Sequence, residues 1–252
     1  MKPLFDLIFE DHDLLVINKP AGLVCHPTKI DEYSSLIGRV RLYLGNDAEH
    51  KPPHLVNRLD RETSGVTILA KNPQIAGQLG KLFETRAVQK EYLALVHGAI
   101  RQDHGIIEAP LGKDEVNLIA IKDCVRPDGA PACTEFWVER RTGSPDVSDL
   151  PPSQTQFSIL RIRPHTGRKH QIRIHLAHIG HPIVGDKLYG GDEDLYLALV
   201  EDRLTTEQKR RLILPHHALH AREIQFCWHN QQRIFRAEPP TWLSSDFRAG
   251  IS

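Results

Sequence analysis

The sequence predicts a protein that mixes β-strands with α-helices. Two short apolar runs separated by polar residues, 4–9 and 14–18, predict two strands near the start of the chain. Residues 105–163 are β-like over most of their length. Apolar residues at helical spacing occur in three segments, which are 31–46, the stretch from Asn72 to Phe83, and 171–179.

Length and composition predict an ordinary globular protein. A chain of 252 residues suffices for one large domain or two small ones, and 40% apolar with 25% charged residues is usual. No apolar run approaches the roughly 18 residues of a membrane span. Asp6 stands where a signal peptide would have its apolar region, so a cytoplasmic protein is expected.

Charge and cysteine content narrow the classes of function. A formal net charge of zero argues against binding nucleic acid by bulk charge, although a local basic cleft stays possible. No C-x-x-C pair occurs among the four cysteines, so neither a zinc ribbon nor a redox motif is predicted. Free thiols that are buried or half-buried are expected at Cys25, Cys124, Cys133 and Cys227.

The first turn with a distinctive composition follows the second strand. Asn18-Lys19-Pro20-Ala21-Gly22 ends that strand, because Pro and Gly force the chain to turn. Pro20 and Gly22 are interpreted as structural. Lys19 is either a solvated lysine or a group close to a ligand.

The stretch 57–65, Asn-Arg-Leu-Asp-Arg-Glu-Thr-Ser-Gly, is rich in charged and hydroxyl side chains and precedes the apolar run Val66–Ala70. The run predicts a buried strand, and residues 63–65 predict a tight turn into it. Asp60 would then lie in a loop ahead of a rigid strand, where catalytic groups are often placed. From these residues alone, the favoured interpretation is structural, an ion pair with Arg58 or Arg61 or a turn cap, because structural ion pairs outnumber active sites.

The middle of the chain adds a helix and three strands. Asn72-Pro73 predicts a helix start, and strands are expected at 89–96, 132–139 and 156–163. Tyr92 in the first of these is either a core aromatic or a site residue. Residues 142–155 hold three prolines and predict an exposed loop with no site.

The stretch 164–182 is the second informative one. Ile172, Leu176 and Ile179 give its helix an apolar face, and a polar face is expected at Gln171, His175 and His178. Residues 161–187 hold six Lys or Arg and one acid, a local net charge of +5. The start of this helix would suit a phosphate or a carboxylate.

A metal site is not expected there. The four histidines follow one another at spacings of 5, 3 and 3, which does not match H-E-x-x-H, and no cysteine pair is near. These histidines are His170, His175, His178 and His181.

The last part of the chain adds peripheral elements. Residues 192–212 predict a charged helical insertion at the surface, 219–226 a final strand region, and 239–252 a peripheral helix and tail.

Three motifs in order resemble those of the RluA-type pseudouridine synthases, which isomerise uridine in RNA. They are Arg-Leu-Asp-x-x-Thr-Ser-Gly at 58–65, Lys-x-Tyr at 90–92, and Thr-Gly-Arg-x-His-Gln-Ile-Arg-x-His at 166–175, and the resemblance extends over about 5–240. Asn-Lys-Pro-x-Gly at 18–22, His-Pro-Ile-Val-Gly-Asp at 181–186 and Tyr189-Gly190 continue it. The sequence departs from the family at Asn57, where His is usual, so fine positioning is in question there.

The resemblance implies a fold, a reaction and a set of site residues. The fold would be α+β, with a long mixed, mostly antiparallel sheet, flanking helices and a catalytic cleft. Residues 1–252 would form a single catalytic domain, with a core over 5–240, a tail at 241–252 and no N-terminal RNA-binding domain. The catalytic residues would be Asp60, Tyr92 and Arg168, and the substrate-binding residues Arg58, Gln171, Arg173 and Ile172.

The implied protein is an RNA-modifying isomerase that needs no cofactor and no metal. Its partner would be ribosomal or transfer RNA, not DNA or a membrane, and it would act as a monomer. The rival from another class is an RNA-binding protein on the same fold without turnover. A histidine-dependent metal hydrolase is a third alternative, which elemental analysis would test.

Overall fold

The computed structural model describes residues 4–26, 31–45, 52–117, 119–143 and 156–243. They divide into two compact units. Unit 1 comprises Met1–Glu91 and His220–Pro240, and unit 2 comprises Tyr92–Leu219 and Thr241–Ser252. Unit 1 is therefore discontinuous in sequence, and unit 2 interrupts it.

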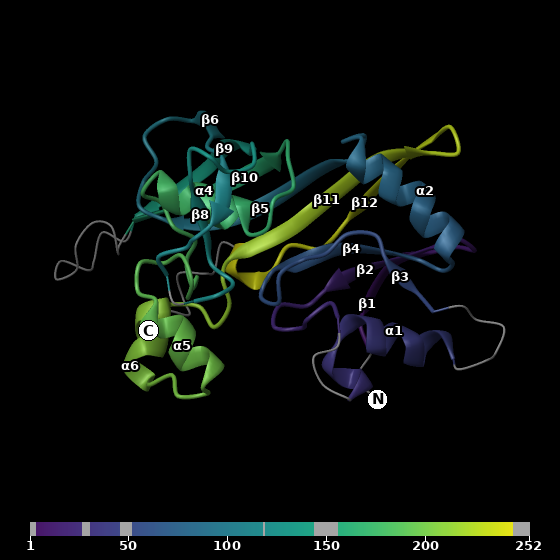
Figure 1. Ribbon diagram of the computed structural model, residues 1–252, viewed down its shortest axis with the longest axis horizontal. Coiled ribbons are helices and arrows are strands. Elements are labelled where there is room, and N and C mark those ends of the chain that lie inside the picture. Colours follow the sequence, from purple (N-terminus) through teal and green to yellow (C-terminus); the bar gives the residue numbers. More distant parts are fainter. Residues whose placement is uncertain (1–3, 27–30, 46–51, 118, 144–155, 244–252) are drawn as a thin grey trace. The chain divides into compact units, whose positions relative to one another are not determined.

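Unit 1 is built on strands from both ends of the chain (Figure 1). Its strand order is β1-β2-β4-β11, with β3 added to β4 and β12 added to β11. Only β4 and β11 run parallel among the pairs described in this unit. The bounds are β1 (Asp6–Glu10), β2 (Leu14–Lys19), β3 (His54–Leu55), β4 (Ser64–Ala70), β11 (Leu219–Trp228) and β12 (Gln231–Arg236).

Helices α1 (Leu36–Leu44) and α2 (Pro73–Glu84) bury alternate residues of β2. The α1 side chains cluster with Leu15 and Ile17, whereas those of α2 cluster with Leu14 and Val16. Both faces of β2 are therefore covered, which explains its unbroken apolar sequence. A 3₁₀ turn, η1 (Glu32–Ser34), precedes α1.

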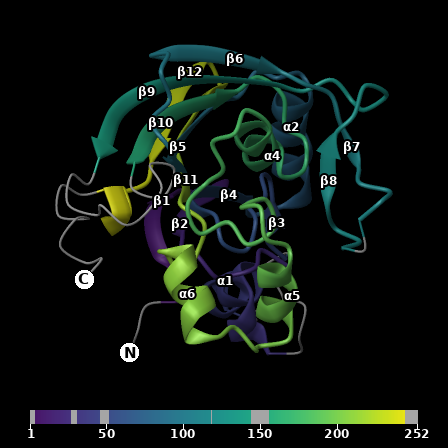
Figure 2. The same cartoon turned by 90° about the vertical axis from the view of Figure 1, so that its left-hand side faces the viewer.

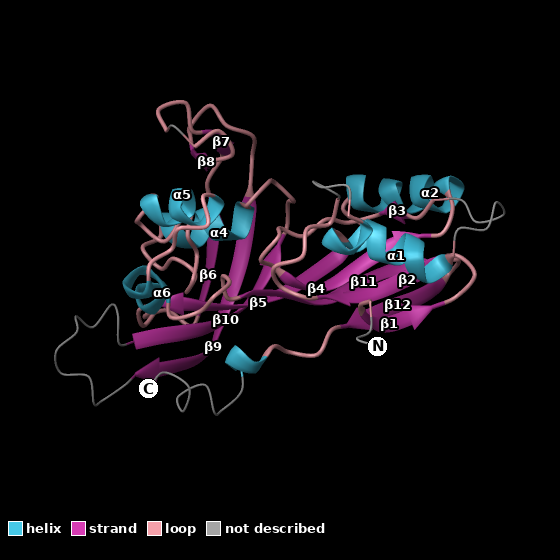
Figure 3. Cartoon of the chain, turned by 90° about the horizontal axis from the view of Figure 1, so that it is seen from below, coloured by secondary structure: helices cyan, strands magenta, loops and turns pink. Residues whose placement is uncertain are grey.

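Unit 2 holds a second set of antiparallel strands, in the order β5-β10-β9-β6. Helix α4 packs against them through Ile172 and Leu176. A two-stranded arm, β7 with β8, projects beyond α4 (Figures 2 and 3). The bounds are β5 (Gln89–His97), β6 (His104–Glu108), β7 (Leu111–Lys113), β8 (Asp123–Val125), β9 (Cys133–Gly143), β10 (Gln156–Pro164), α4 (Gln171–His178), α5 (Asp194–Val200), α6 (Thr206–Leu212) and η2 (Thr241–Leu243).

The α+β class and the mostly antiparallel pairing are confirmed. So are the strand at 14–18, the helix that starts at Pro73 and the helical insertion after 192. Asn72 caps α2, accepting the N–H of Ile75 at 2.9 Å. The single-domain organisation stays a prediction.

Some boundaries differ from expectation. β4 begins at Ser64, so two residues assigned to a turn already pair with β11. The helix expected over 31–46 is split into η1 and α1, because Ser35 has an extended backbone and caps α1 through the N–H of Gly38. Residues 144–155 and 244–252 lie outside the described part. No helix in the described ranges combines the length and the hydropathy needed to cross a membrane.

Candidate active site

The loop that carries Asp60 joins β3 to β4 in unit 1. Asp60 is half-buried and Arg58 is exposed. The carbonyl of Asp60 accepts the N–H of Thr63 at 3.2 Å, which closes a turn directly after the carboxylate residue. The loop therefore has a defined backbone rather than a free tip.

Gly65 fixes the end of this loop against β11. It has φ +113°, and a Cβ at this position would lie 2.2 Å from the carbonyl oxygen of Ala221. Only glycine permits this approach. Beside it, Ser64 Oγ lies 2.9 Å from His220 Nδ1, and burial lowers the pKa of His220 to about 4, so the ring is neutral.

Lys19 holds the other side of the loop. Its side chain is fully buried, and Nζ donates to the carbonyls of Pro20, Leu23 and Arg61 at 2.9, 2.8 and 3.1 Å. Burial lowers the pKa of Lys19 to about 8, against the opposing attraction of Cys25 and Asp60. Lys19 is therefore neither a solvated surface lysine nor open to a ligand, and it ties the 18–22 turn to the Asp60 loop.

Asn57, at the start of the loop, anchors the loop to β4 through two hydrogen bonds. Its Nδ2 donates to the carbonyl of Val66 at 3.2 Å, and its Oδ1 accepts the N–H of Ile68 at 2.8 Å. An amide side chain supplies a donor and an acceptor together. The residue that departs from the family pattern thus serves to anchor the strand.

Tyr92 lies on β5, opposite Ile162 of β10. It is half-buried and packs against the apolar cluster of unit 2 that contains Ile162, Leu160 and Phe136. One part of the ring is thus held by the core while the rest stays accessible. The packing agrees with a core aromatic, and the role of Tyr92 as a site residue stays a prediction.

Arg168 is exposed in the loop between β10 and α4. Its Nε donates to the carbonyl of Pro131 at 3.2 Å, and its backbone N–H donates to Gln171 Oε1 at 3.0 Å. Gln171 also accepts from Thr166 Oγ1 at 2.7 Å, and its Nε2 donates to the carbonyl of Cys133 and to Thr134 Oγ1. Gln171 therefore shapes the loop that presents Arg168.

Of the three residues expected on the polar face of α4, two are buried and one is exposed. Gln171 and His175 are 4% and 0% exposed, whereas His178 is exposed. His175 Nδ1 lies 2.9 Å from Thr134 Oγ1, and Nε2 lies 2.9 Å from the carbonyl oxygen of Ala109. Partners 37 to 66 positions earlier in the chain make this burial possible, and helical spacing alone does not reveal them.

Arg173 forms a buried ion pair with Asp186. Its Nε and guanidinium NH2 group donate to the two carboxylate oxygens at 2.7 and 2.9 Å. Burial would raise the pKa of Asp186, but the charge and hydrogen bonds of Arg173 outweigh it and hold that pKa well below its usual range. Arg173 and Ile172 are each 7% exposed, so neither offers a broad surface to RNA.

Several of the basic side chains in 161–187 are therefore buried or paired within the protein. Arg173 and Lys187 are buried, Lys169 pairs with Asp123 at 3.0 Å, and the Arg161 guanidinium stacks 4.1 Å from the Trp137 ring centre. Among the described residues no group of three or more His, Cys, Asp or Glu has metal-binding geometry.

The expected catalytic residues lie in both units. Asp60 and Arg58 belong to unit 1, and Tyr92 and Arg168 to unit 2. The pairing of Arg168 with Asp60 stays a prediction. Three residues near these positions were not among the predicted site residues: Thr63 and His220 beside the Asp60 loop, and Tyr189 beside α4. The sequence did give a signal for two of them, because Thr63 belongs to the first motif and Tyr189-Gly190 continues the family resemblance.

Comparisons with known proteins identify the family of this chain. The RNA pseudouridylate synthase family matches residues 13–178. The dual-specificity RNA pseudouridine synthase RluA of Vibrio parahaemolyticus is 38% identical over 192 residues, which are 76% of this chain and 71% of that protein. An uncharacterized RNA pseudouridine synthase of Aquifex aeolicus is 36% identical over 188 residues, 73% of this chain and 56% of that protein.

A solved structure supports the same assignment. Human RNA pseudouridylate synthase domain containing 1 superposes with a TM-score of 0.70 at 25% identity, covering 94% of this chain and 84% of that one. The match of 13–178 contains Asp60, Tyr92 and Arg168. The chain belongs to the RluA-type family of RNA pseudouridine synthases.

Proposed function

We propose that this chain converts specific uridines of RNA to pseudouridine, with Asp60 as the nucleophile. The observation that carries the proposal is the support around Asp60. The Asp60–Thr63 turn, the Lys19 ammonium and the close approach of Gly65 to Ala221 restrain the loop from separate directions. Such restraint suits a catalytic carboxylate, which needs a fixed orientation.

The proposed reaction is a rearrangement. The target uridine is turned out of the RNA stack, at a cost of about a few kcal/mol. The Asp60 carboxylate attacks the nucleoside, and the N1–C1′ bond breaks. The freed base rotates and forms a C5–C1′ bond, which releases Asp60. C5 loses its proton and N1 gains one, so product and substrate are isomers and no redox cofactor is required.

Two residues of unit 2 complete the proposed chemistry. Tyr92 stacks on the base and assists loss of the C5 proton, which suits a ring held on one side by the core. Arg168 keeps Asp60 ionised and oriented, because a neighbouring cation favours a charged carboxylate. The two units together then form the one catalytic domain expected from the sequence.

The proposed substrate contacts differ in kind. Arg58 is exposed and suits a phosphate or the space vacated by the flipped base. The other three residues, Gln171, Ile172 and Arg173, are buried. We therefore propose that they affect substrate binding indirectly, by shaping the loop that carries Arg168. The substrate class proposed is ribosomal or transfer RNA, and the protein is proposed to act on it in the cytoplasm as a monomer, without DNA.

Tritium release from RNA labelled at C5 of uridine tests the proposal. The purified chain should release tritium from total ribosomal or transfer RNA, and Asp60→Asn should not. RNA binding without release by the wild-type chain would instead support the alternative of an RNA-binding protein without turnover. Comparing pseudouridines in RNA from cells with and without the gene would then identify the target.

A further inference from the structure

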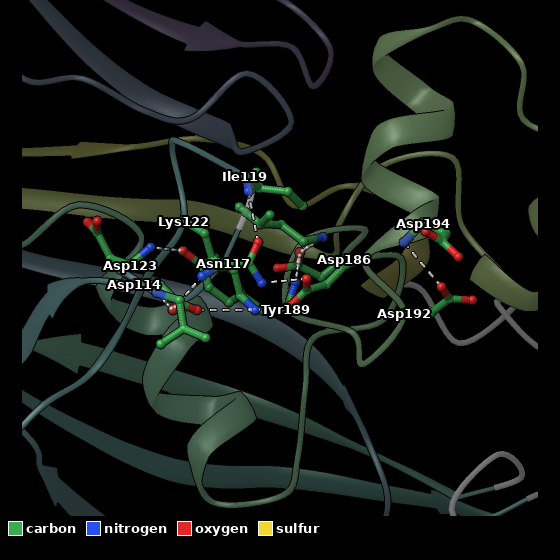
Figure 4. Close-up of polar contacts among 12 residues, drawn as sticks. Asp114, Asn117, Ile119, Lys122, Asp123, Asp186, Tyr189, Asp192 and Asp194 are labelled. Atoms are coloured by element: carbon green, nitrogen blue, oxygen red, sulfur yellow. Dashed lines mark hydrogen bonds and ion pairs between the residues drawn. The ribbon is translucent and has the colours of Figure 1, made fainter.

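The hydroxyl of Tyr189 connects two segments of unit 2 that are distant in sequence. Oη lies 2.9 Å from His170 Nδ1. The same oxygen accepts the N–H of Asp123 at 3.3 Å (Figure 4). Asp123 opens β8 in the projecting arm, and His170 immediately precedes α4. Tyr189 itself is 9% exposed.

The Tyr189 hydroxyl can serve both neighbours at once. A backbone N–H can only donate, so the bond from Asp123 occupies a lone pair of the Tyr189 oxygen. The phenolic proton and the second lone pair remain for His170 Nδ1, and the tautomer of the ring decides which group donates. Burial raises the pKa of Tyr189 well above its usual range, so the phenol keeps this proton at neutral pH.

Tyr189 is a rigid support for this contact. Asp186 Oδ1 accepts the N–H groups of Leu188 and Tyr189 at 2.9 and 3.0 Å, and Asp186 is in turn held by both donors of Arg173. The Arg173 guanidinium also lies 5.0 Å from the centre of the Tyr189 ring. The buried Arg173–Asp186 pair thus fixes the backbone and the ring together.

His170, the hydrogen-bond partner of Tyr189, has a backbone conformation that needs support from its neighbours. His170 has φ 55°, a left-handed conformation that is uncommon outside glycine, and its side chain makes no capping bond to α4. It follows Arg168 by two residues. Arg168 also reaches the carbonyl of Pro131, just ahead of β9. A shift of His170 would therefore move the guanidinium of Arg168.

We propose that Tyr189 is a positioning residue. Its hydroxyl links His170 to Asp123 of the β7–β8 arm, and this link fixes the conformation of the loop that carries Arg168. The proposal rests on the proposed function, in which Arg168 orients Asp60. The Lys169–Asp123 ion pair joins the same segments, but its lysine is exposed, so solvent screens the pair and weakens its contribution.

The test compares Tyr189→Phe with Tyr196→Phe. Tyr196 is half-buried on α5 and packs against the apolar cluster that contains Tyr189. Single-turnover rates at saturating enzyme should fall about tenfold in Tyr189→Phe, as expected for the loss of one buried hydrogen bond. RNA affinity should change less than about twofold. Tyr196→Phe should react at the wild-type rate.

A second measurement separates positioning from general destabilisation. If Tyr189 acts through Arg168, adding Tyr189→Phe to Arg168→Ala should not slow the reaction further. Hydrogen exchange at the Asp123 amide should accelerate in Tyr189→Phe and not in Tyr196→Phe. His170→Asn, which tolerates the left-handed backbone but lacks a ring nitrogen at the position of Nδ1, should repeat the loss of rate.

A wild-type rate in Tyr189→Phe overturns the inference, and so does an equal slowing in the Arg168→Ala background or an effect on RNA affinity alone. In each case tritium release by the wild-type chain and its loss in Asp60→Asn still uphold the proposed function. If the wild-type chain releases no tritium, both fail.

Discussion

The ammonium group of Lys19 lies 3.1 Å from the carbonyl oxygen of Arg61, although 42 positions separate the two residues in the sequence. This contact joins the Asn-Lys-Pro-x-Gly turn to the loop of Asp60. The first motif of the chain is therefore a support for the second, and its lysine is enclosed by carbonyl oxygens.

Stability should depend on pH through Lys19. Its pKa is about 8 in the folded protein and 10.5 as the ordinary value. Between these values the unfolded chain holds a proton that the folded chain has released, so the free energy of unfolding rises with pH. Between pH 8 and 10.5, the free energy of unfolding of the wild type should rise relative to that of Lys19→Met by up to about 3 kcal/mol. Urea denaturation of both proteins across this pH range measures the difference. A constant difference would contradict the buried, depressed lysine.

Replacing Asp60 should remove chemistry and spare structure. Asp60→Asn and Asp60→Ala keep the backbone turn to Thr63, which uses the main-chain carbonyl. Tritium release should be lost, with thermal unfolding and RNA affinity close to wild type. Residual activity near the wild-type rate would exclude Asp60 as the nucleophile.

Arg168 should act on the chemical step. Arg168→Ala should slow single turnover by about 100-fold or more while RNA affinity changes little, and Arg168→Lys should restore little, because an ammonium lacks the planar fork of guanidinium. Lys169→Ala and Arg161→Ala are the matched controls and should mainly weaken binding and flatten its salt dependence. A wild-type single-turnover rate in Arg168→Ala would refute the assignment.

Asn57 should contribute to stability through β4. Asn57→Ala leaves the N–H of Ile68 and the carbonyl of Val66 without their side-chain partners, at a cost of about 1–3 kcal/mol in urea denaturation. Asn57→His introduces the usual family residue. Its free energy of unfolding should lie between those of the wild type and Asn57→Ala, and it should keep activity. Equal stability of all three proteins would mean that water replaces both hydrogen bonds.

Activity should survive chelators. The sequence has no metal-ligand motif, and ring nitrogens of His170, His175 and His181 already face protein groups. Treatment with EDTA followed by dialysis should leave tritium release unchanged at constant magnesium. Loss of release that zinc restores and magnesium does not would contradict the prediction and indicate a zinc site.

Local patterns predicted the elements whose signals are local. Asn72-Pro73 marks the start of α2 because capping involves residues only three positions apart. The apolar run at 14–18 predicted β2 because both of its faces are buried. β12 was not predicted, because Gln231–Arg236 is mostly polar and is ordered by pairing with β11.

In the candidate site too, local motifs predicted some features, whereas others depend on contacts between distant parts of the chain. The motifs indicated Asp60, Tyr92 and Arg168, but the burial of Gln171 and Arg173 depends on Thr134 and Asp186, whose proximity is set by the tertiary fold. Likewise, the positive charge of 161–187 counts side chains that the fold neutralises or buries. Spacing along one helix does not contain this information.

The contact of Gly65 with Ala221 has a consequence during synthesis. The Asp60 loop leaves the ribosome early, whereas the strand that closes against it follows only after all of Tyr92–Leu219 has been made. Because a nascent chain is extended by about 5–20 residues per second, the loop waits roughly 10 to 30 seconds for its neighbour. The part of unit 2 over Tyr92–Leu219 is made in that interval, and a ribosome that stops before β11 releases a chain whose Asp60 loop has no completed support.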